Sequence, residues 1–152
     1  MKSFLLYKNA PLIKFSLLND GIFYQGDLPG KDYDLAVCPT NHKQVILDID
    51  CKPGKDIGYY NIPEDIYLEL MQSFHYLTKS GGMHVFLNYS GDKLLKNCST
   101  KYSLDLRIGA NKETKNAGGY VRYNGLIPVK DIEPLIKSTS LKVNMFLEKL
   151  FS

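Results

Sequence analysis

The chain has 152 residues, of which 44% are hydrophobic and 23% charged, so its composition is that of a globular domain and not of a disordered chain. Its net charge of +3 permits nucleic-acid binding without requiring it. No stretch approaches the ~18 apolar residues of a membrane span, and the three cysteines match neither a disulfide framework nor a zinc site. We therefore expect one cytoplasmic domain over residues 1–152, with no membrane partner.

The N-terminal third of the chain predicts short strands. Residues 4–7 and 22–24 are candidate strands, and the Asn-Asp-Gly sequence at 19–21 predicts a turn between them. Two further apolar runs, at 35–38 and 44–50, are separated by five turn-rich residues. This spacing predicts an antiparallel hairpin.

The strand predicted at 44–50 carries two aspartates at its end. Because strand side chains alternate between faces, Ile46, Asp48 and Asp50 share one face. The two aspartate Cα atoms are expected about 6.5–7 Å apart, close enough for both carboxylates to bind one hard cation. The alternative is that this face of the strand is simply solvated.

A helix is predicted from Asn61, an N-cap candidate followed by proline and glutamate, to about Lys79. Its expected buried face consists of Ile66, Leu70, Phe74 and Leu77. The Ser-Gly-Gly sequence that follows ends the helix, and residues 83–87 form the next predicted strand. This strand contains His84, and a lone histidine in a strand is often a structural residue rather than a ligand.

Strict alternation at 103–108 predicts a strand with Leu104, Leu106 and Ile108 inward and Asp105 and Arg107 on the opposite face. Taken alone, an Asp–Arg pair of this kind is usually solvated and contributes little to the stability of the fold.

Residues 109–119 are polar and glycine-rich, and we expect a mobile loop whose Lys112 and Lys115 contact a nucleic-acid backbone. A strand is predicted at 120–123. The C-terminal segment 131–151 is expected to be helical. It comprises a short helix at 131–137 and a longer one at 141–151, which docks through Leu141, Phe146, Leu147 and Leu150. The predicted class is α+β around a mostly antiparallel sheet.

Three predicted strands thus carry unusual polar residues, namely Asp48 with Asp50, His84, and Asp105. If these strands are neighbours, three carboxylates and an imidazole crowd onto one sheet face, and their repulsion calls for a cation. Oxygen ligands favour Mg²⁺ or Mn²⁺ over zinc.

A phosphate-binding role is suggested by the residues that precede His84. Gly81 and Gly82 would let phosphate oxygens approach backbone N–H groups, with Lys79 and Ser80 beside them.

Three motifs in this order resemble the signature of the archaeo-eukaryotic primase superfamily, in particular the prim-pol domains of viruses and plasmids. They are Leu47-Asp48-Ile49-Asp50, Ser80-Gly81-Gly82-Met83-His84-Val85-Phe86 and Leu104-Asp105-Leu106-Arg107. Gly118-Gly119-Tyr120-Val121 resembles the strand that often follows the third motif, so the resemblance covers about residues 34–123.

The resemblance implies an RRM-like, mostly antiparallel catalytic sheet with packed helices and a template-dependent nucleotidyl transferase. Asp48, Asp50 and Asp105 would be catalytic residues that hold two divalent metals, Mg²⁺ or Mn²⁺. The residues that would bind the nucleoside triphosphate are Lys79, Ser80, Gly81, Gly82, His84 and Arg107. The implied partners are a DNA template and primer, and a replicative helicase on another chain or on a part of the protein absent here.

Two other functions stay open at this stage. The chain could be a non-catalytic nucleic-acid-binding module, because its eleven tyrosines and scattered lysines suit stacking and backbone contact. It could also be a metal-dependent nuclease that uses the same carboxylates. The Ser-Gly-Gly sequence before His84 favours the transferase, since a nuclease has less need of a triphosphate cradle.

Overall fold

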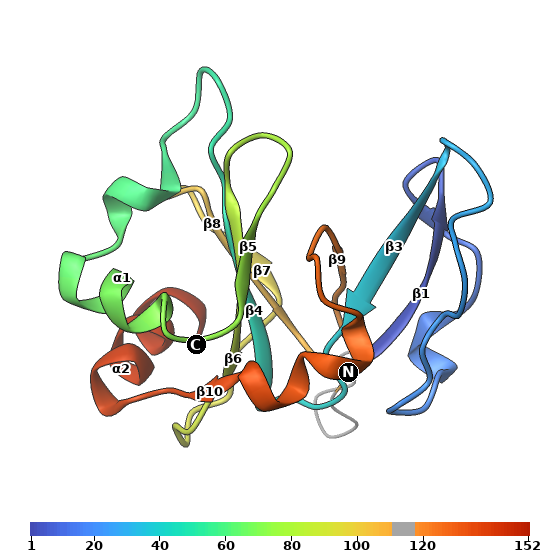
Figure 1. The fold of residues 1–152 in the computed structure, drawn as a ribbon. Coiled ribbons are helices and arrows are strands. Elements are labelled where there is room, and N and C mark those ends of the chain that lie inside the picture. The colour runs from blue at the N-terminus through green and yellow to red at the C-terminus, as the bar shows by residue number, and fades with distance from the viewer. Residues whose placement is uncertain (111–117) are drawn as a thin grey trace.

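The computed structural model describes residues 1–110 and 118–152, and this part of the chain folds into two β-sheets and two α-helices (Figure 1). The six-stranded sheet contains, in spatial order, β10 (Lys137–Ser138), β6 (Met83–Asn88), β4 (Gln44–Ile49), β8 (Leu104–Ile108) and β7 (Cys98–Ser99), with β5 (His75–Leu77) paired to β6. The four-stranded sheet contains β2 (Ala10–Pro11), β1 (Lys2–Tyr7), β3 (Tyr33–Cys38) and β9 (Val121–Arg122). Among these described strands, only β10 and β6 pair in parallel.

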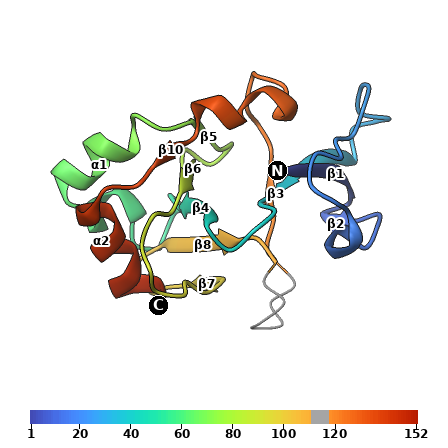
Figure 2. The ribbon, with the colours of Figure 1, turned by 90° about the horizontal axis from the view of Figure 1, so that it is seen from below.

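The helices α1 (Glu64–Leu70) and α2 (Leu141–Phe151) cover one face of the larger sheet, and the smaller sheet lies beyond its other face (Figures 1 and 2). The connections contain 3-10 helices, namely η1 (Phe15–Leu17), η2 (Gly58–Asn61), η3 (Val129–Asp131) and η4 (Glu133–Leu135). The chain is therefore a single α+β domain with mostly antiparallel sheets, as its sequence predicts. None of the helices in the described residues is long and apolar enough to cross a membrane.

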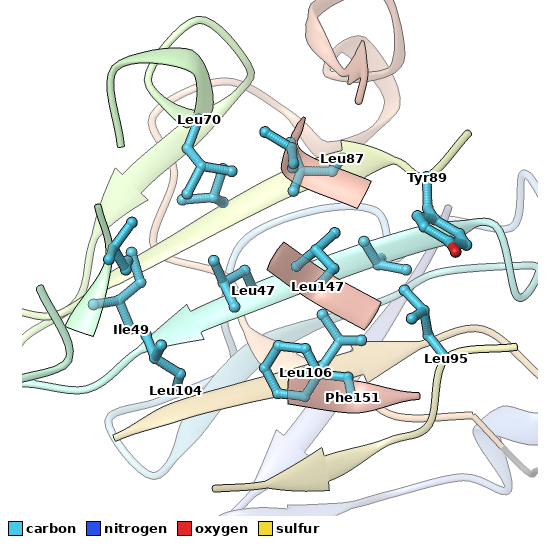
Figure 3. Close-up of a cluster of buried hydrophobic side chains, with 14 of the residues drawn as sticks. Leu47, Ile49, Leu70, Leu87, Tyr89, Leu95, Leu104, Leu106, Leu147 and Phe151 are labelled. Atoms are coloured by element: carbon cyan, nitrogen blue, oxygen red, sulfur yellow. The ribbon is translucent and has the colours of Figure 1, made fainter. Parts of the chain in front are cut away.

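The first core lies between the larger sheet and the helices (Figure 3). Alternation along β4 directs Leu47 and Ile49 into it, and α2 contributes Leu147 and Phe151. All four side chains are fully buried, so truncating any of them to alanine is expected to cost about 2–5 kcal/mol.

A second core fills the space between the two sheets. Ile46 of β4 and Phe86 of β6 belong to it together with Val37 of β3 and Val121 of β9. The face of β4 that carries the aspartates is therefore covered at Gln44 and Ile46 and becomes partly exposed at Asp48.

The predicted hairpin of 35–38 with 44–50 is wrong, because β3 and β4 belong to different sheets. Each strand has both of its edges occupied by other partners: β1 and β9 flank β3, while β6 and β8 flank β4. The short connection turns the chain from one sheet into the other instead of closing a ladder. The strand predicted at 4–7 is confirmed as part of β1, whereas 22–24 forms no strand.

The helix predicted from Asn61 to Lys79 is much shorter in the structure. Its N-cap is Pro63, and α1 ends at Leu70. The Ser73 hydroxyl then donates a hydrogen bond to the Phe86 carbonyl oxygen, and the chain continues as β5 along the edge of β6. Phe74 packs against the second core and not against the helix face.

The strands predicted at 83–87, 103–108 and 120–123 are confirmed as β6, β8 and the shorter β9. The C-terminal helix has the predicted bounds of 141–151, but its docking face differs, since Leu141 is 75% exposed and Val143 is buried instead. The segment 131–137 forms 3-10 turns and not an α-helix.

The loop predictions for Lys112 and Lys115 concern residues 111–117, which lie outside the described residues.

Candidate functional site

Four polar residues stand in one row across the larger sheet. Asp48 of β4 is in register with His84 of β6 on one side and with Asp105 of β8 on the other. One strand further out, Tyr76 of β5 is in register with His84. Because residues paired across a sheet share a face, these four side chains lie side by side where the second core ends.

Both ring nitrogens of His84 face oxygen atoms. Its Nε2 lies 3.3 Å from Asp48 Oδ1, and its Nδ1 lies 2.8 Å from the Tyr76 hydroxyl oxygen. That hydroxyl uses its only proton to donate a hydrogen bond to the Arg122 carbonyl oxygen at 2.7 Å, so it accepts a hydrogen bond from His84 Nδ1–H. Its Nε2 faces the Asp48 carboxylate, which can only accept a hydrogen bond. Burial raises the pKa of Tyr76 far above its usual range, which keeps this hydroxyl protonated.

Asp50 follows β4 directly and is held by its backbone. Its N–H donates to the Ser103 carbonyl oxygen at 2.9 Å, and its Oδ1 lies 3.8 Å from Lys52 Nζ. Burial raises the pKa of Asp50, and the negative charges of Asp48 and then Asp105 raise it further against the opposing charge of Lys52. The three carboxylates therefore repel one another within the site.

Asp48, Asp50 and His84 line a pocket of about 360 Å³. Its wall combines carboxylates with basic and hydroxyl side chains, and its lining residues are Asp48, Asp50, Thr78, Lys79, Ser80, His84, Arg107, Tyr120, Val121, Arg122 and Asn124. Lys79 and Ser80 come from the tight connection between β5 and β6, which the Thr78 N–H closes by donating to the Gly82 carbonyl oxygen at 2.9 Å.

Most of the predicted site residues thus meet in one place. The six that line the pocket together are Asp48, Asp50, Lys79, Ser80, His84 and Arg107. The three that do not line it are Asp105, Gly81 and Gly82. Asp105 is nevertheless adjacent, because its Oδ2 lies 3.5 Å from Arg107 Nη2.

The two glycines have backbone roles in the structure. Gly81 has φ of +88°, a conformation that a residue with a side chain rarely adopts. A Cβ on Gly82 would lie 2.2 Å from the Ile49 carbonyl oxygen, so glycine allows β6 to approach the end of β4.

The carboxylates of Asp48, Asp50 and Asp105 suit a hard divalent cation, because they offer oxygen ligands and negative charge. Carboxylate oxygens are the ligands of Mg²⁺ and Mn²⁺, and the mutual repulsion felt by Asp50 is what a bound cation relieves. Each carboxylate is paired with a different basic side chain, namely His84, Lys52 or Arg107. Within residues 1–110 and 118–152, no three His, Cys, Asp or Glu side chains are grouped closely enough to hold a metal ion. A bound cation would compete with these basic side chains for the same carboxylates.

Sequence reasoning did not assign a site role to six residues near this pocket. Five of them line it, and Tyr76 contacts His84 from behind. The five are Thr78, Tyr120, Val121, Arg122 and Asn124. The available signal for Tyr76 was the run His75-Tyr76-Leu77-Thr78 before Ser-Gly-Gly, which is typical of a hairpin strand. Arg122 is held by Asp34 of β3, whose Oδ2 lies 3.6 Å from Arg122 Nε.

The chain matches no protein-family model, no curated protein and no solved structure. A functional proposal therefore rests on the residues of the pocket and their contacts.

Proposed function

We propose that this chain is the catalytic domain of a template-dependent nucleotidyl transferase of the primase–polymerase type, which adds nucleotides to a DNA primer in viral or mobile-element replication. One observation carries the proposal. Residues from three sequence motifs, spread from Asp48 to Arg107, line a single pocket together. Such convergence is not required by the packing of the opposite face of these strands against the helices.

The chemistry of the wall suits a nucleoside triphosphate. Lys79, Arg107 and Arg122 place positive charge on the pocket, and the Ser80 hydroxyl can donate a hydrogen bond. Charge-assisted hydrogen bonds from such groups to phosphate are stronger than neutral ones. The pocket volume of about 360 Å³ is within the usual range for small-molecule sites.

Asp48, Asp50 and Asp105 would hold Mg²⁺ or Mn²⁺. When bound, these ions activate the attacking hydroxyl and stabilise charge on the phosphoryl group. The basic partners of the carboxylates, His84 and Arg107, are then available to donate to phosphate oxygens. The protein's own contribution is to keep both kinds of group beside each other on one rigid sheet.

Primer extension tests this proposal. A labelled primer–template with Mn²⁺ and either deoxynucleoside or ribonucleoside triphosphates should be extended by the wild-type protein, and not by Asp48→Ala or Asp50→Ala. Asp27→Asn is the matched control, because Asp27 is exposed and does not line the pocket. A shortened primer would indicate a nuclease, and DNA binding without either product would indicate a binding module, so both results would contradict the transferase.

The compartment and partners are part of the same proposal. Cys38, Cys51 and Cys98 are free, which suits the reducing cytoplasm, and burial raises the pKa of Cys38 to about 11. The DNA template and primer and a replicative helicase are the proposed macromolecular partners.

A further inference from the structure

We propose that Tyr76 is a positioning residue of this site: its hydroxyl orients His84 toward Asp48 and ties that orientation to β9, which carries Arg122. The effect on catalysis rests on the proposed function. The hydrogen-bonded chain itself does not, and it can be tested without any activity.

The Tyr76 hydroxyl contacts one group of each sheet. It lies 2.8 Å from His84 Nδ1 and 2.7 Å from the Arg122 carbonyl oxygen. The carbonyl can only accept, so the hydroxyl proton points to Arg122 and a hydroxyl lone pair points to the imidazole. This directionality leaves His84 Nδ1 as a donor and aims Nε2 at the Asp48 carboxylate, 3.3 Å away.

Packing holds the tyrosine in this position. Its ring meets the His84 ring edge-to-face, with centroids 5.2 Å apart and planes at 80°. Only 8% of Tyr76 is exposed, so water has little access to replace its hydroxyl. Removing the oxygen would leave the buried Nδ1–H of His84 without its acceptor, which is costly enough to drive the imidazole into another rotamer.

The same hydroxyl joins the two sheets at the pocket. Tyr76 and His84 belong to the larger sheet, whereas Arg122 belongs to β9 of the smaller sheet. Arg122 and Asn124 both line the pocket, and the Asp34 carboxylate lies 3.6 Å from Arg122 Nε. This hydroxyl therefore ties the β9 wall of the pocket to the imidazole.

Tyr123 provides a matched control within the same core. Its ring lies 5.2 Å from the Tyr76 ring, centroid to centroid, and both tyrosines are buried in the second core. The Tyr123 hydroxyl donates to the Ile127 carbonyl oxygen, away from His84. Tyr123→Phe thus removes a buried hydroxyl at a similar cost in stability while leaving the His84 contact intact.

The direct test observes the His84 ring N–H by proton NMR on histidine-labelled protein, without substrate or metal. We expect a slowly exchanging His84 Nδ1–H signal in the wild type and in Tyr123→Phe, and its loss in Tyr76→Phe. A signal that persists unshifted in Tyr76→Phe would overturn the proposal.

A second substitution covers the case in which Tyr76→Phe does not fold. Incorporating 3-fluorotyrosine at 76 retains the hydroxyl but weakens it as an acceptor, so the His84 signal should shift. The same analogue at 123 should leave the signal in place. An unshifted signal with the analogue at 76 would overturn the proposal in the same way.

The functional test compares nucleotide kinetics in primer extension. Tyr76→Phe should raise the KM for the nucleotide about tenfold relative to Tyr123→Phe, the effect of losing one oriented hydrogen bond. Equal KM values in the two variants would show that Tyr76 has no positioning role in the reaction. If the wild type extends no primer, the proposed function fails, while the NMR comparison still decides what Tyr76 does to His84.

Discussion

His84 Nε2 and Asp48 Oδ1 lie 3.3 Å apart, between two neighbouring antiparallel strands, with only 6% of His84 exposed. The imidazole therefore points toward the carboxylate strand. It is also buried and hydrogen-bonded at its other nitrogen, as a structural histidine would be. The sequence left two alternatives for His84, a structural histidine and a phosphate ligand, and its position beside Asp48 is compatible with both. That His84 binds phosphate stays a prediction.

Replacing His84 tests both roles at once. His84→Ala should lower the free energy of unfolding by about 1–3 kcal/mol, because a buried hydrogen bond to Tyr76 and the contact with Asp48 are lost. In the folded fraction, it should also weaken triphosphate binding, measured by calorimetry with Mn²⁺ present. His42→Ala, in the loop between β3 and β4, is the control and should change neither quantity. Wild-type triphosphate affinity in folded His84→Ala would remove His84 from the binding site.

Asp50 makes the metal-free protein less stable at neutral pH. Burial, with the charge of Asp48, raises its pKa in the folded state, so the folded protein holds this proton more tightly than the unfolded chain does. Stability should therefore fall as pH rises from the unfolded pKa of about 4 through the raised folded value.

The pH experiment uses Asp50→Asn in EDTA. This variant should melt about 1–2 °C above the wild type at pH 7, since the site is partly exposed and Lys52 already offsets some repulsion. At a pH below the unfolded pKa, the difference should vanish. A variant that melts lower than the wild type at pH 7 would show that Asp50 is not under repulsive strain.

Added Mn²⁺ should stabilise the folded protein. At a concentration 100-fold above its dissociation constant, a cation that binds only the folded state adds about 2.7 kcal/mol. Asp48→Ala should abolish the rise in melting temperature, whereas Asp27→Asn should retain it in full. An equal rise in all three proteins would place the cation elsewhere on the chain.

No side chain should be tolerated at Gly82, because the backbone of β4 lies too close to it. A Cβ there would lie 2.2 Å from the Ile49 carbonyl oxygen, and main-chain atoms of β4 cannot move aside easily. Gly82→Ala is therefore expected to lower the free energy of unfolding by about 3 kcal/mol in urea denaturation. Gly30→Ala is the control, because the nearest atom to its added Cβ, on the Tyr33 ring, is 3.9 Å away. Equal stabilities would contradict the close approach of β6 to β4.

The sequence alone determined the strands whose side chains alternate. Apolar residues at every second position of β4, β6 and β8 specify which face is buried, and this pattern depends only on neighbours along the chain. Asp48, His84 and Asp105 were recognisable because each is a polar residue between two apolar neighbours of its strand. The C-terminal helix was predictable for the same reason, from its own periodicity.

The tertiary structure decided which edges pair and which residues complete the pocket. Ile66, Leu70, Phe74 and Leu77 satisfy helical spacing. Phe74 nevertheless packs, partly buried, against the second core, and the chain after it becomes a strand on the edge of β6. Tyr76 and Arg122 are 46 residues apart, and their hydrogen bond exists only because the two sheets pack together. Local alternation selects the face that a side chain occupies, whereas long-range burial selects the partner that it meets there.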